Sequence, residues 1–325
     1  MGVADRRSTG TVLITGAGGL LGGAVARRYI SLGAEVVGLD VAWDGARAAI
    51  KPAGVARVDG DVRDTELVRR CLADRHVDTV IHLAAQTLVG PALLDPADTF
   101  SNNIEGSWSV LEACRAMPSV EAIVVASTDK AYGDWSGRPY REDMALRARH
   151  PYDVSKAATD LLAQSYAVTY GLPVTVTRCG NMYGGGDLNW SRIVPGTVRS
   201  VLEGEPPIIR SDGTFVRDYL HVDDAAAGVL RLADAIRDDP ALAGEAFNFA
   251  GRDRITVRDI VGRILGLMGS TLEPTVLGLD LTEIREQRVS TGKARRVLGW
   301  QPRVGLDAGL REAIDWYRAH LAVVT

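Results

Sequence analysis

The chain has 325 residues and a net charge of −4, from 37 basic and 41 acidic side chains. That balance excludes the dense basic face of a nucleic-acid-binding protein, and a hydrophobic content of 46% excludes a disordered chain. The three cysteines, Cys71, Cys114 and Cys179, lie too far apart for a zinc motif or a disulfide framework. We therefore expect reduced packing cysteines, no metal site and no nucleic-acid partner.

No apolar signal-peptide core precedes Gly16, and the longest apolar runs, such as Ala122–Ala126, have only the length of a strand. The sequence therefore predicts a cytoplasmic protein with no membrane partner.

Short β-branched runs alternate with longer helical patterns through the first half of the chain. The expected strands are Thr11–Thr15, Glu35–Leu39, Ala56–Val58, Thr79–His82, Ala122–Ala126 and Pro173–Arg178. The expected helices are Leu20–Leu32, Thr65–Leu72, Phe100–Ala116 and Tyr152–Tyr170. Strands that alternate with helices form βαβ crossovers, so the pattern predicts an α/β fold of Rossmann type with a doubly wound parallel sheet.

The pattern changes after about residue 180, where glycines and prolines interrupt shorter elements. We expect residues 1–180 to form a Rossmann domain and residues 181–325 to form mostly a smaller C-terminal substrate-binding lobe. The two parts are expected to interleave, because Ala246–Ala250 has the pattern of a buried strand, and segments near 215–250 should join the sheet. Two further helices are expected over Arg258–Met268 and Ala308–His320.

A glycine-rich loop follows the first expected strand. Gly16, Gly19 and Gly22 have the spacing Gly-x-x-Gly-x-x-Gly, which permits a tight turn and lets backbone N–H groups approach a pyrophosphate. Asp40 ends the next strand, where a carboxylate accepts hydrogen bonds from the adenosine ribose and repels a 2′-phosphate. The loop predicts a site for NAD rather than NADP. The alternative is a βα turn without a ligand, with Asp40 as a surface carboxylate.

Further cofactor contacts are expected at neighbouring strand ends. Asp61 follows the third expected strand and is a candidate acceptor for the adenine amino group. The run His82-Leu-Ala-Ala-Gln closes the fourth strand with small residues, and His82 itself is interpreted as a packed histidine rather than a catalytic one. The expected NAD contacts are Gly16, Gly19, Leu20, Leu21, Gly22, Asp40, Asp61, Val62, Leu83, Ala84, Ala85, Asn103, Tyr152 and Lys156.

A tyrosine and a lysine, Tyr152 and Lys156, stand four positions apart at the start of an expected long helix and therefore share one face. An ammonium beside a phenol lowers the pKa of the tyrosine, as does a positive nicotinamide ring, and makes the tyrosine a general base. Thr128 follows the fifth strand and is a candidate partner for the same substrate hydroxyl. Tyr-x-x-x-Lys is common by chance, but together with the glycine loop it predicts a redox site.

These motifs make the chain resemble the extended short-chain dehydrogenase/reductases of the nucleotide-sugar epimerase and dehydratase family. The resemblance runs from Thr15-Gly-Ala-Gly-Gly-Leu-Leu-Gly to Leu298-Gly-Trp-Gln-Pro, which is almost the whole chain. It implies a tightly bound NAD and a nucleoside-diphosphate sugar as the substrate. It also implies a homodimer formed by the helices that contain Glu112 and Leu161.

The resemblance also assigns substrate contacts. It places Asn181 and Arg217 at the nucleotide diphosphate, Arg192 at a substrate phosphate, Gln86 at the substrate and Asn103 near the tyrosine. The alternative roles are a surface ion pair between Arg217 and Asp218, and a solvated helix position for Arg192.

Two residues distinguish the branches of the family. Asp129 and Lys130 stand where 4,6-dehydratases carry an Asp-Glu pair, and the Asp-Lys version resembles CDP-glucose 4,6-dehydratases, as do Gly180-Asn-Met-Tyr-Gly-Gly-Gly-Asp and Glu283-Ile-Arg-Glu-Gln. The resemblance implies that Asp129 protonates the departing 6-hydroxyl. Lys130 would take the C5 proton or stabilise the enolate. The glycine loop and Arg217-Asp-Tyr-Leu-His differ from that group, which leaves the base and the sugar open.

The sequence therefore predicts an NAD-dependent 4,6-dehydratase of a nucleoside-diphosphate hexose, with Thr128, Asp129, Lys130, Tyr152 and Lys156 as its catalytic residues. The alternatives are a nucleotide-sugar epimerase or decarboxylase, and some epimerases that act elsewhere on the ring also carry a lysine at the position of Lys130. The alternative for Asp129-Lys130 itself is a surface-facing ion pair at a strand end. A non-enzymatic NAD sensor would have no need of the Thr128, Tyr152 and Lys156 set.

Overall fold

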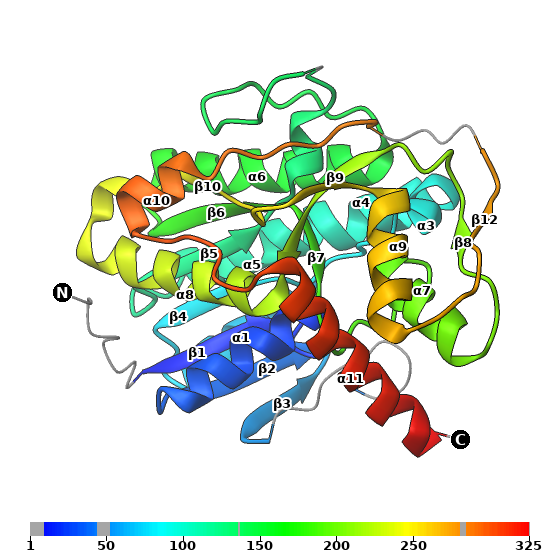
Figure 1. Cartoon of the computed structure of the whole chain (residues 1–325). Coiled ribbons are helices and arrows are strands. Elements are labelled where there is room, and N and C mark those ends of the chain that lie inside the picture. Colours follow the sequence, from blue (N-terminus) through cyan, green and yellow to red (C-terminus); the bar gives the residue numbers. More distant parts are fainter. Residues whose placement is uncertain (1–9, 44–52, 136, 280–283, 325) are drawn as a thin grey trace.

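The computed structural model describes residues 10–43, 53–135, 137–279 and 284–324. Within these ranges, seven parallel strands form one sheet in the order β10-β6-β5-β4-β1-β2-β3 (Figure 1). This order confirms the predicted doubly wound sheet. The strands are β1 (Thr11–Thr15), β2 (Glu35–Asp40), β3 (Val55–Asp59), β4 (Thr79–His82), β5 (Ala122–Ala126), β6 (Val174–Cys179) and β10 (Ala246–Phe249).

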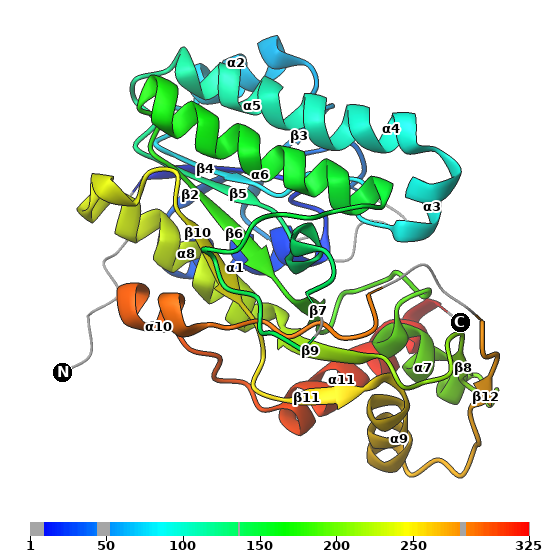
Figure 2. The ribbon, with the colours of Figure 1, turned by 90° about the horizontal axis from the view of Figure 1, so that it is seen from above.

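Helices cover both faces of the sheet (Figure 2). On one face lie α1 (Leu20–Ser31) and α8 (Val222–Asp238), and on the other α2 (Thr65–Asp74), α5 (Gly106–Arg115) and α6 (Pro151–Tyr170). Each face has its own apolar core, which explains why strands such as β5 are apolar throughout. The three cysteines are buried free thiols within these cores. None of the described helices has the length and apolar character to cross a bilayer.

A second layer of structure packs over the carboxyl end of this sheet. It contains a three-stranded sheet in the order β11-β9-β7 and a small sheet of β12 and β8. Its elements are β7 (Asn181–Tyr183), α7 (Ile193–Leu202), β8 (Ile208–Ile209), β9 (Val216–His221), β11 (Arg254–Thr256), α9 (Val257–Met268), β12 (Thr275–Val276) and α11 (Leu306–Val324). Helix α10 (Gly292–Leu298) packs instead against β10 and α8 of the main sheet. Strand β10 joins the main sheet beside β6, as expected for interleaved parts, while the division near residue 180 stays a prediction.

The helix expected over Phe100–Ala116 is present, but it begins earlier and is not uniform. After α3 (Val89–Leu94), the chain runs without a break through α4 (Pro96–Phe100), a π-helical turn η1 (Ser101–Glu105) and α5. The π turn changes the partners of Asn103, whose carbonyl oxygen accepts hydrogen bonds from the hydroxyls of Ser107 at 2.5 Å and Thr159 at 3.0 Å. Such turns are frequent at functional sites, and this one sets the position of Asn103.

One buried ion pair joins the elements that carry the predicted catalytic residues. Asp160 of α6 binds the Arg178 guanidinium of β6 through two contacts of 2.8 and 2.9 Å, and both side chains are buried. A third nitrogen of Arg178 donates to the Tyr132 hydroxyl at 2.8 Å. Tyr132 ends the short helix η2 (Asp129–Tyr132), so the pair connects α6, β6 and η2.

Asp160→Asn should lower the free energy of unfolding by about 3–5 kcal/mol, because it leaves the Arg178 charge buried without its partner. Urea unfolding measures this change. The matched control is Asp143→Asn, which removes an exposed pair with Arg141 and should cost less than about 1 kcal/mol. Equal, small losses for the two variants would show that the buried pair does not hold the elements together.

Candidate active site

The glycine loop lies at the carboxyl end of β1. Gly16 has a φ of +71°, a left-handed conformation that favours glycine. A Cβ on Gly22 would lie 2.1 Å from the Gly16 carbonyl oxygen, so the turn excludes any side chain there. The Asp40 carboxylate accepts hydrogen bonds from the N–H groups of Gly18 at 2.9 Å and Ala42 at 3.2 Å. Exposed backbone beside a strand-end carboxylate fits the pyrophosphate and ribose of NAD.

The loop after β4 lies against this turn. A Cβ on Gly16 would lie 2.8 Å from the Ala84 nitrogen, which shows how closely the two loops approach. The N–H groups of Leu83 and Ala84 both donate to the Thr15 hydroxyl, at 3.2 Å each. Ala85 continues the same loop, and Leu20 and Leu21 begin α1 directly after Gly19. The structure thus brings these predicted cofactor contacts together at one edge of the sheet.

Asp61 has a partner that the sequence did not reveal. Its carboxylate binds the Arg63 guanidinium through two nitrogens, at 2.6 and 3.0 Å. The hydrogen bonds from Arg63 hold the pKa of the Asp61 carboxyl below its usual value. Val62, next in the chain, is buried, and its side chain lies against Gly106 of α5. The role of Asp61 at the adenine stays a prediction.

His82 is a packed histidine, as the sequence indicated. Its ring nitrogens lie 2.8 Å from the Thr15 hydroxyl and 3.1 Å from the Ser107 hydroxyl. Burial lowers the pKa of His82 to about 3, so the ring is neutral at physiological pH. It joins β1, β4 and α5 beneath the site.

The predicted catalytic residues meet where β5 ends and α6 begins. The Thr128 hydroxyl donates to Asp129 Oδ1 at 3.1 Å, and Thr128 also hydrogen bonds with the Tyr152 side chain. The Ser127 hydroxyl donates to the Lys156 carbonyl oxygen at 3.2 Å, which ties the strand end to the helix. Thr128, Tyr152 and Lys130 line one cavity, whereas Lys156 is buried behind them.

The electrostatics of Tyr152 in the chain alone are set by burial. Burial raises the pKa of the Tyr152 phenol to about 12, although the Arg192 charge and the Thr128 hydrogen bond act in the opposite direction. Burial also lowers the pKa of Lys156 to about 8, partly offset by the charge of Asp160. The lowered Tyr152 pKa expected from Lys156 together with a positive nicotinamide ring stays a prediction.

Asp129 and Lys130 face the interior rather than the solvent. Asp129 is 1% exposed, and the Lys130 ammonium lies 3.9 Å from its Oδ1. The ammonium also donates to Asn181 Oδ1 at 3.2 Å. Among the described residues, Asp129 Oδ2 has no hydrogen-bond partner although it is buried. A surface-facing ion pair is therefore the wrong interpretation, since an acid and a cation both stand beside Thr128.

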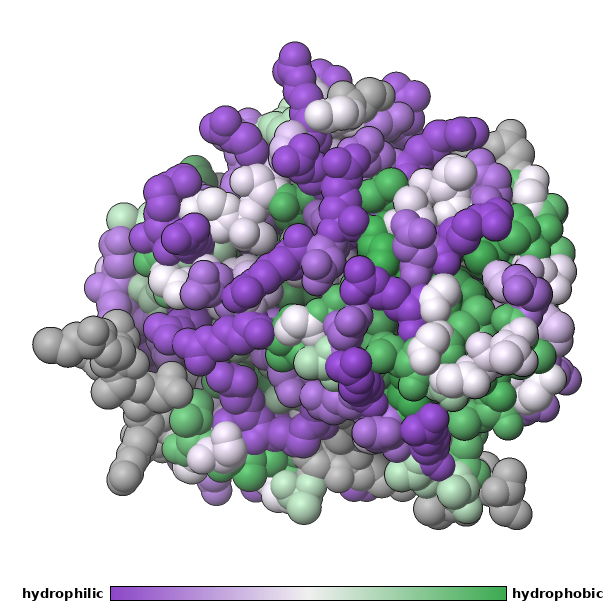
Figure 3. All heavy atoms as spheres, in the orientation of Figure 1, coloured by the Kyte–Doolittle hydropathy of each residue, from purple (hydrophilic) through white to green (hydrophobic). Residues whose placement is uncertain are grey.

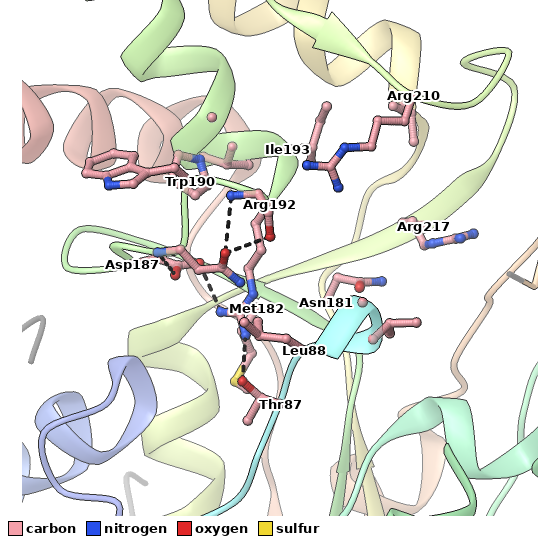
Figure 4. Close-up of a pocket in the computed structure, with 18 of the residues that line it drawn as sticks. Thr87, Leu88, Asn181, Met182, Asp187, Trp190, Arg192, Ile193, Arg210 and Arg217 are labelled. Carbon is pink, nitrogen blue, oxygen red and sulfur yellow. Dashed lines mark hydrogen bonds and ion pairs between the residues drawn. The ribbon is translucent and has the colours of Figure 1, made fainter. Parts of the chain in front are cut away.

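The cavity has a volume of about 710 Å³ and extends from Tyr152 and Lys130 outward to the second layer. Arg192, Arg210 and Arg217 surround it (Figure 4). This concentration of guanidinium groups in a cavity of this size suits a doubly charged diphosphate. Hydrophobic surface gathers on the side that carries β8 and β12 (Figure 3), where Ile208 is exposed and also lines the cavity.

The three predicted substrate residues of this second layer differ in how they are held. Arg192 lines the cavity and joins two of its segments, binding Asp187 Oδ2 at 3.0 Å and the Thr87 hydroxyl at 3.4 Å. Arg217 is buried and donates to the carbonyl oxygens of Val216 at 2.9 Å and Arg285 at 3.2 Å. Both side-chain atoms of Asn181 are engaged, one by Lys130 and the other by Gln287 at 3.5 Å.

The Asn103 side chain is hydrogen bonded to the backbone of Gln86. Asn103 exchanges hydrogen bonds with the Gln86 backbone, at 2.7 and 3.0 Å, and donates to the Ser155 hydroxyl at 2.8 Å. The Gln86 side chain donates to Leu88 and Thr99 within its own segment. Asn103 therefore ties the loop after β4 to the first turn of α6, which carries Tyr152. Their contacts with cofactor and substrate stay predictions.

Three residues of the cavity escaped the sequence argument. Arg210 follows β8 and lines the cavity opposite Arg192, and Trp190 stands one turn before α7. Asp187 holds Arg192 and lies at the end of the quoted Gly-Gly-Gly-Asp run, which was the available signal. No local pattern marked Arg210, because its position depends on how β8 pairs with β12.

A family model described as the NAD dependent epimerase/dehydratase family matches residues 12–250. The chain belongs to this family. Its cofactor is accordingly NAD, which agrees with the glycine turn and Asp40.

Individual proteins of the family resemble the whole chain. A dTDP-glucose 4,6-dehydratase of Streptomyces griseus is 32% identical over 319 residues, covering 95% of this chain and 94% of the relative. A dTDP-glucose 4,6-dehydratase from Streptomyces venezuelae, solved with NAD bound, is 28% identical with a TM-score of 0.86 and covers 96% and 98%. A UDP-glucose 4-epimerase from Thermotoga maritima, solved with UDP-glucose, is 27% identical with a TM-score of 0.86 and covers 96% and 99%.

Burial lowers the pKa of the Lys156 ammonium from 10.5 to about 8, which means that its charge destabilises the folded, NAD-free protein at pH 7. Lys156→Met removes this charge and should therefore raise the free energy of unfolding at pH 7 by on the order of 2–3 kcal/mol. Between pH 8 and 10.5 the unfolded wild type binds more protons than the folded one, so wild-type stability rises there and the advantage of the variant disappears. Urea unfolding across this range tests the sign.

The control for this prediction is Lys293→Met. Lys293 pairs with Glu245 and donates to the Ala246 carbonyl, so the substitution should not stabilise the protein. A gain for Lys156→Met that persists unchanged at pH 10.5 would contradict the assigned burial of its charge.

Proposed function

We propose that this protein is an NAD-dependent 4,6-dehydratase that converts a nucleoside-diphosphate hexose into the 4-keto-6-deoxy sugar and water. The observation that supports dehydration most directly is the buried Asp129 beside Lys130, next to Thr128 and at the cavity that Tyr152 lines. Elimination across C5 and C6 requires an acid and a base or cation in addition to the tyrosine, and these two residues supply them.

In this proposal, Tyr152, Lys130 and Asp129 each carry one of the proton transfers. Tyr152 takes the proton of the sugar 4-hydroxyl, with the Thr128 hydroxyl as its hydrogen-bond partner. The glycine loop and Asp40 would hold NAD, which would supply the acceptor for the C4 hydride and the donor of that hydride to C6. Lys130 takes the C5 proton and becomes the cation beside the enolate, and Asp129 gives its proton to the departing 6-hydroxyl. Asp129 Oδ2, buried and without a partner among the described residues, is the oxygen available for that transfer.

The diphosphate is assigned to the arginines of the second layer. Arg217 and Arg210 line the cavity from β9 and from the residue after β8, while Arg192 lines it from just before α7. A guanidinium binds two phosphate oxygens at once, so these groups would hold the nucleotide while the hexose reaches Tyr152. The nucleoside is open, because the relatives include proteins named for dTDP-glucose and for UDP-glucose.

An epimerase is the second candidate, supported by the similarity to the UDP-glucose 4-epimerase. It would use Tyr152 and Thr128 in the same way but would not need the buried Asp129. The acid beside Lys130 therefore favours dehydration.

We also infer that the protein forms a homodimer through α5 and α6, which run side by side on the outside of the sheet (Figure 2). Val154, Leu161 and Val168 of α6 are exposed at a seven-residue spacing, and Trp108 of α5 is exposed as well. A stripe with that spacing is typical of helices that pack against a partner helix. The cytoplasmic location stays a prediction of the sequence.

The proposal predicts that the purified protein, incubated with CDP-, dTDP-, UDP- and GDP-glucose, converts one of them into a product lighter by one water molecule. Mass spectrometry of the nucleotide sugars measures this. An unchanged mass with a new stereoisomer on chromatography would contradict dehydration and would support the epimerase.

Two variants serve as controls for this experiment. Tyr152→Phe should abolish all turnover, since it removes the base for the first step. Asp129→Asn should keep the reduction of bound cofactor by the sugar, seen in its near-ultraviolet absorbance, but slow the loss of water by about 10²–10⁴-fold. Equal loss of both steps would contradict the role of Asp129 as the acid.

A further inference from the structure

Gln287 is a buried side chain behind the cavity that the mechanism above does not use. It is 1% exposed, and it ends the run Glu283-Ile-Arg-Glu-Gln, of which Glu283 lies outside the described residues. Its backbone N–H donates to the Val216 carbonyl oxygen at 3.1 Å, so the main chain is held to β9 whatever the side chain is. Within the described part of the chain, its side-chain nitrogen Nε2 has no hydrogen-bond partner.

An unpaired buried amide is unfavourable, and an apolar side chain of the same shape would avoid the cost. The fold therefore gains nothing from the Nε2 group of Gln287. The other end of the side chain, Oε1, lies 3.5 Å from the Nδ2 atom of Asn181. This contact connects Gln287 to Lys130, because the second atom of the Asn181 amide accepts from the Lys130 ammonium at 3.2 Å.

The Lys130 ammonium fixes the direction of this series of contacts. An ammonium only donates, so Asn181 must present its oxygen to Lys130 and its NH₂ group to the opposite side. There it needs an acceptor, and the Gln287 Oε1 atom is the one that the structure places within reach. Without that acceptor, the NH₂ group of Asn181 would be left without a partner on that side, and the amide would be free to turn away from the Lys130 ammonium to find one.

We propose that Gln287 is a positioning residue that orients the Asn181 amide and so holds the Lys130 ammonium beside Asp129. The orientation itself is a property of the folded protein. Its catalytic consequence, correct placement of Lys130 at C5 of the sugar, rests on the proposed dehydratase function. Gln287 touches neither Lys130 nor, by this assignment, the reacting atoms, and it acts through Asn181 alone.

The first test follows the reactivity of single lysines and needs no substrate. The chain has four lysines, Lys51, Lys130, Lys156 and Lys293, so trace acetylation with acetic anhydride at pH 8 followed by mass spectrometry reports each one separately. In Gln287→Leu, Lys130 should react about 3–10-fold faster than in the wild type. The reason is that its charge-assisted hydrogen bond to Asn181 is weakened, which leaves the amine more available to the reagent. Gln287→Glu keeps an acceptor oxygen in either protonation state, so its Lys130 should react as in the wild type or more slowly.

Lys293 is the internal control, because it is held by Glu245 and the Ala246 carbonyl and does not contact the series. Unchanged Lys130 reactivity in Gln287→Leu would overturn the proposal. A parallel increase at Lys130 and Lys293 would overturn it too, since that result indicates general loosening of the fold. Gln287→Met, which also lacks the acceptor but is unbranched, should repeat the result of Gln287→Leu if packing is not the cause.

The second test uses the nucleotide sugar that the wild type dehydrates. Gln287→Leu should lower kcat about 10-fold or more while KM changes less than about threefold, and Gln287→Glu should restore most of kcat. A change confined to KM would overturn the catalytic part of the inference. If the wild type dehydrates none of the sugars, the proposed function fails, while the lysine measurement still decides whether Gln287 positions Lys130.

Discussion

The buried ion pair between Asp160 and Arg178 is the constraint on which the site depends. Asp160 lies one helical turn after Lys156 and two turns after Tyr152, so its attachment to β6 fixes the depth and rotation of α6. The same guanidinium binds Tyr132 at the end of η2, the short helix that begins with Asp129 and Lys130. One buried ion pair therefore fixes the position of Tyr152 on α6 relative to that of Asp129 on η2.

The folded protein buries two groups, Tyr152 and Lys156, whose charged forms are disfavoured by burial. Burial raises the pKa of Tyr152 and lowers that of Lys156, so the protein alone favours a neutral phenol and destabilises the charge on the lysine. Arg192 reaches the cavity from the second layer and is the nearby charge that acts most strongly in the other direction on Tyr152. Active sites commonly sacrifice stability in this way.

The sequence was sufficient to predict what depends on local patterns. Strands β1 to β6 follow from short apolar runs bounded by turns, and the glycine loop and Asp40 mark the cofactor edge because their spacing is set by one βαβ unit. The sequence also grouped Thr128, Asp129, Lys130 and Tyr152, since each follows a strand or begins a helix at the same edge of the sheet.

Features that depend on tertiary contacts were not predictable. The π turn at Asn103 arises from contacts with Ser107 and Thr159, of which the second lies on another helix. The burial that raises the pKa of Tyr152 in the chain alone also depends on tertiary packing, and the Arg192 charge that opposes it lies just before α7 in the second layer. Arg210 and Gln287 reach the site only because β8 pairs with β12 and residues 285–289 run beside β9.

In the proposed dehydration, the hydrogen removed from C4 of the hexose returns to C6 of the same molecule. A nucleoside-diphosphate glucose that carries deuterium at C4 tests this transfer, with NMR or mass spectrometry of the isolated product. We expect a 4-keto-6-deoxy sugar that contains the deuterium in its C6 methyl group. Deuterium found at C4 of an epimerised hexose would rule out dehydration and would leave the buried Asp129 and Lys130 without the role assigned to them.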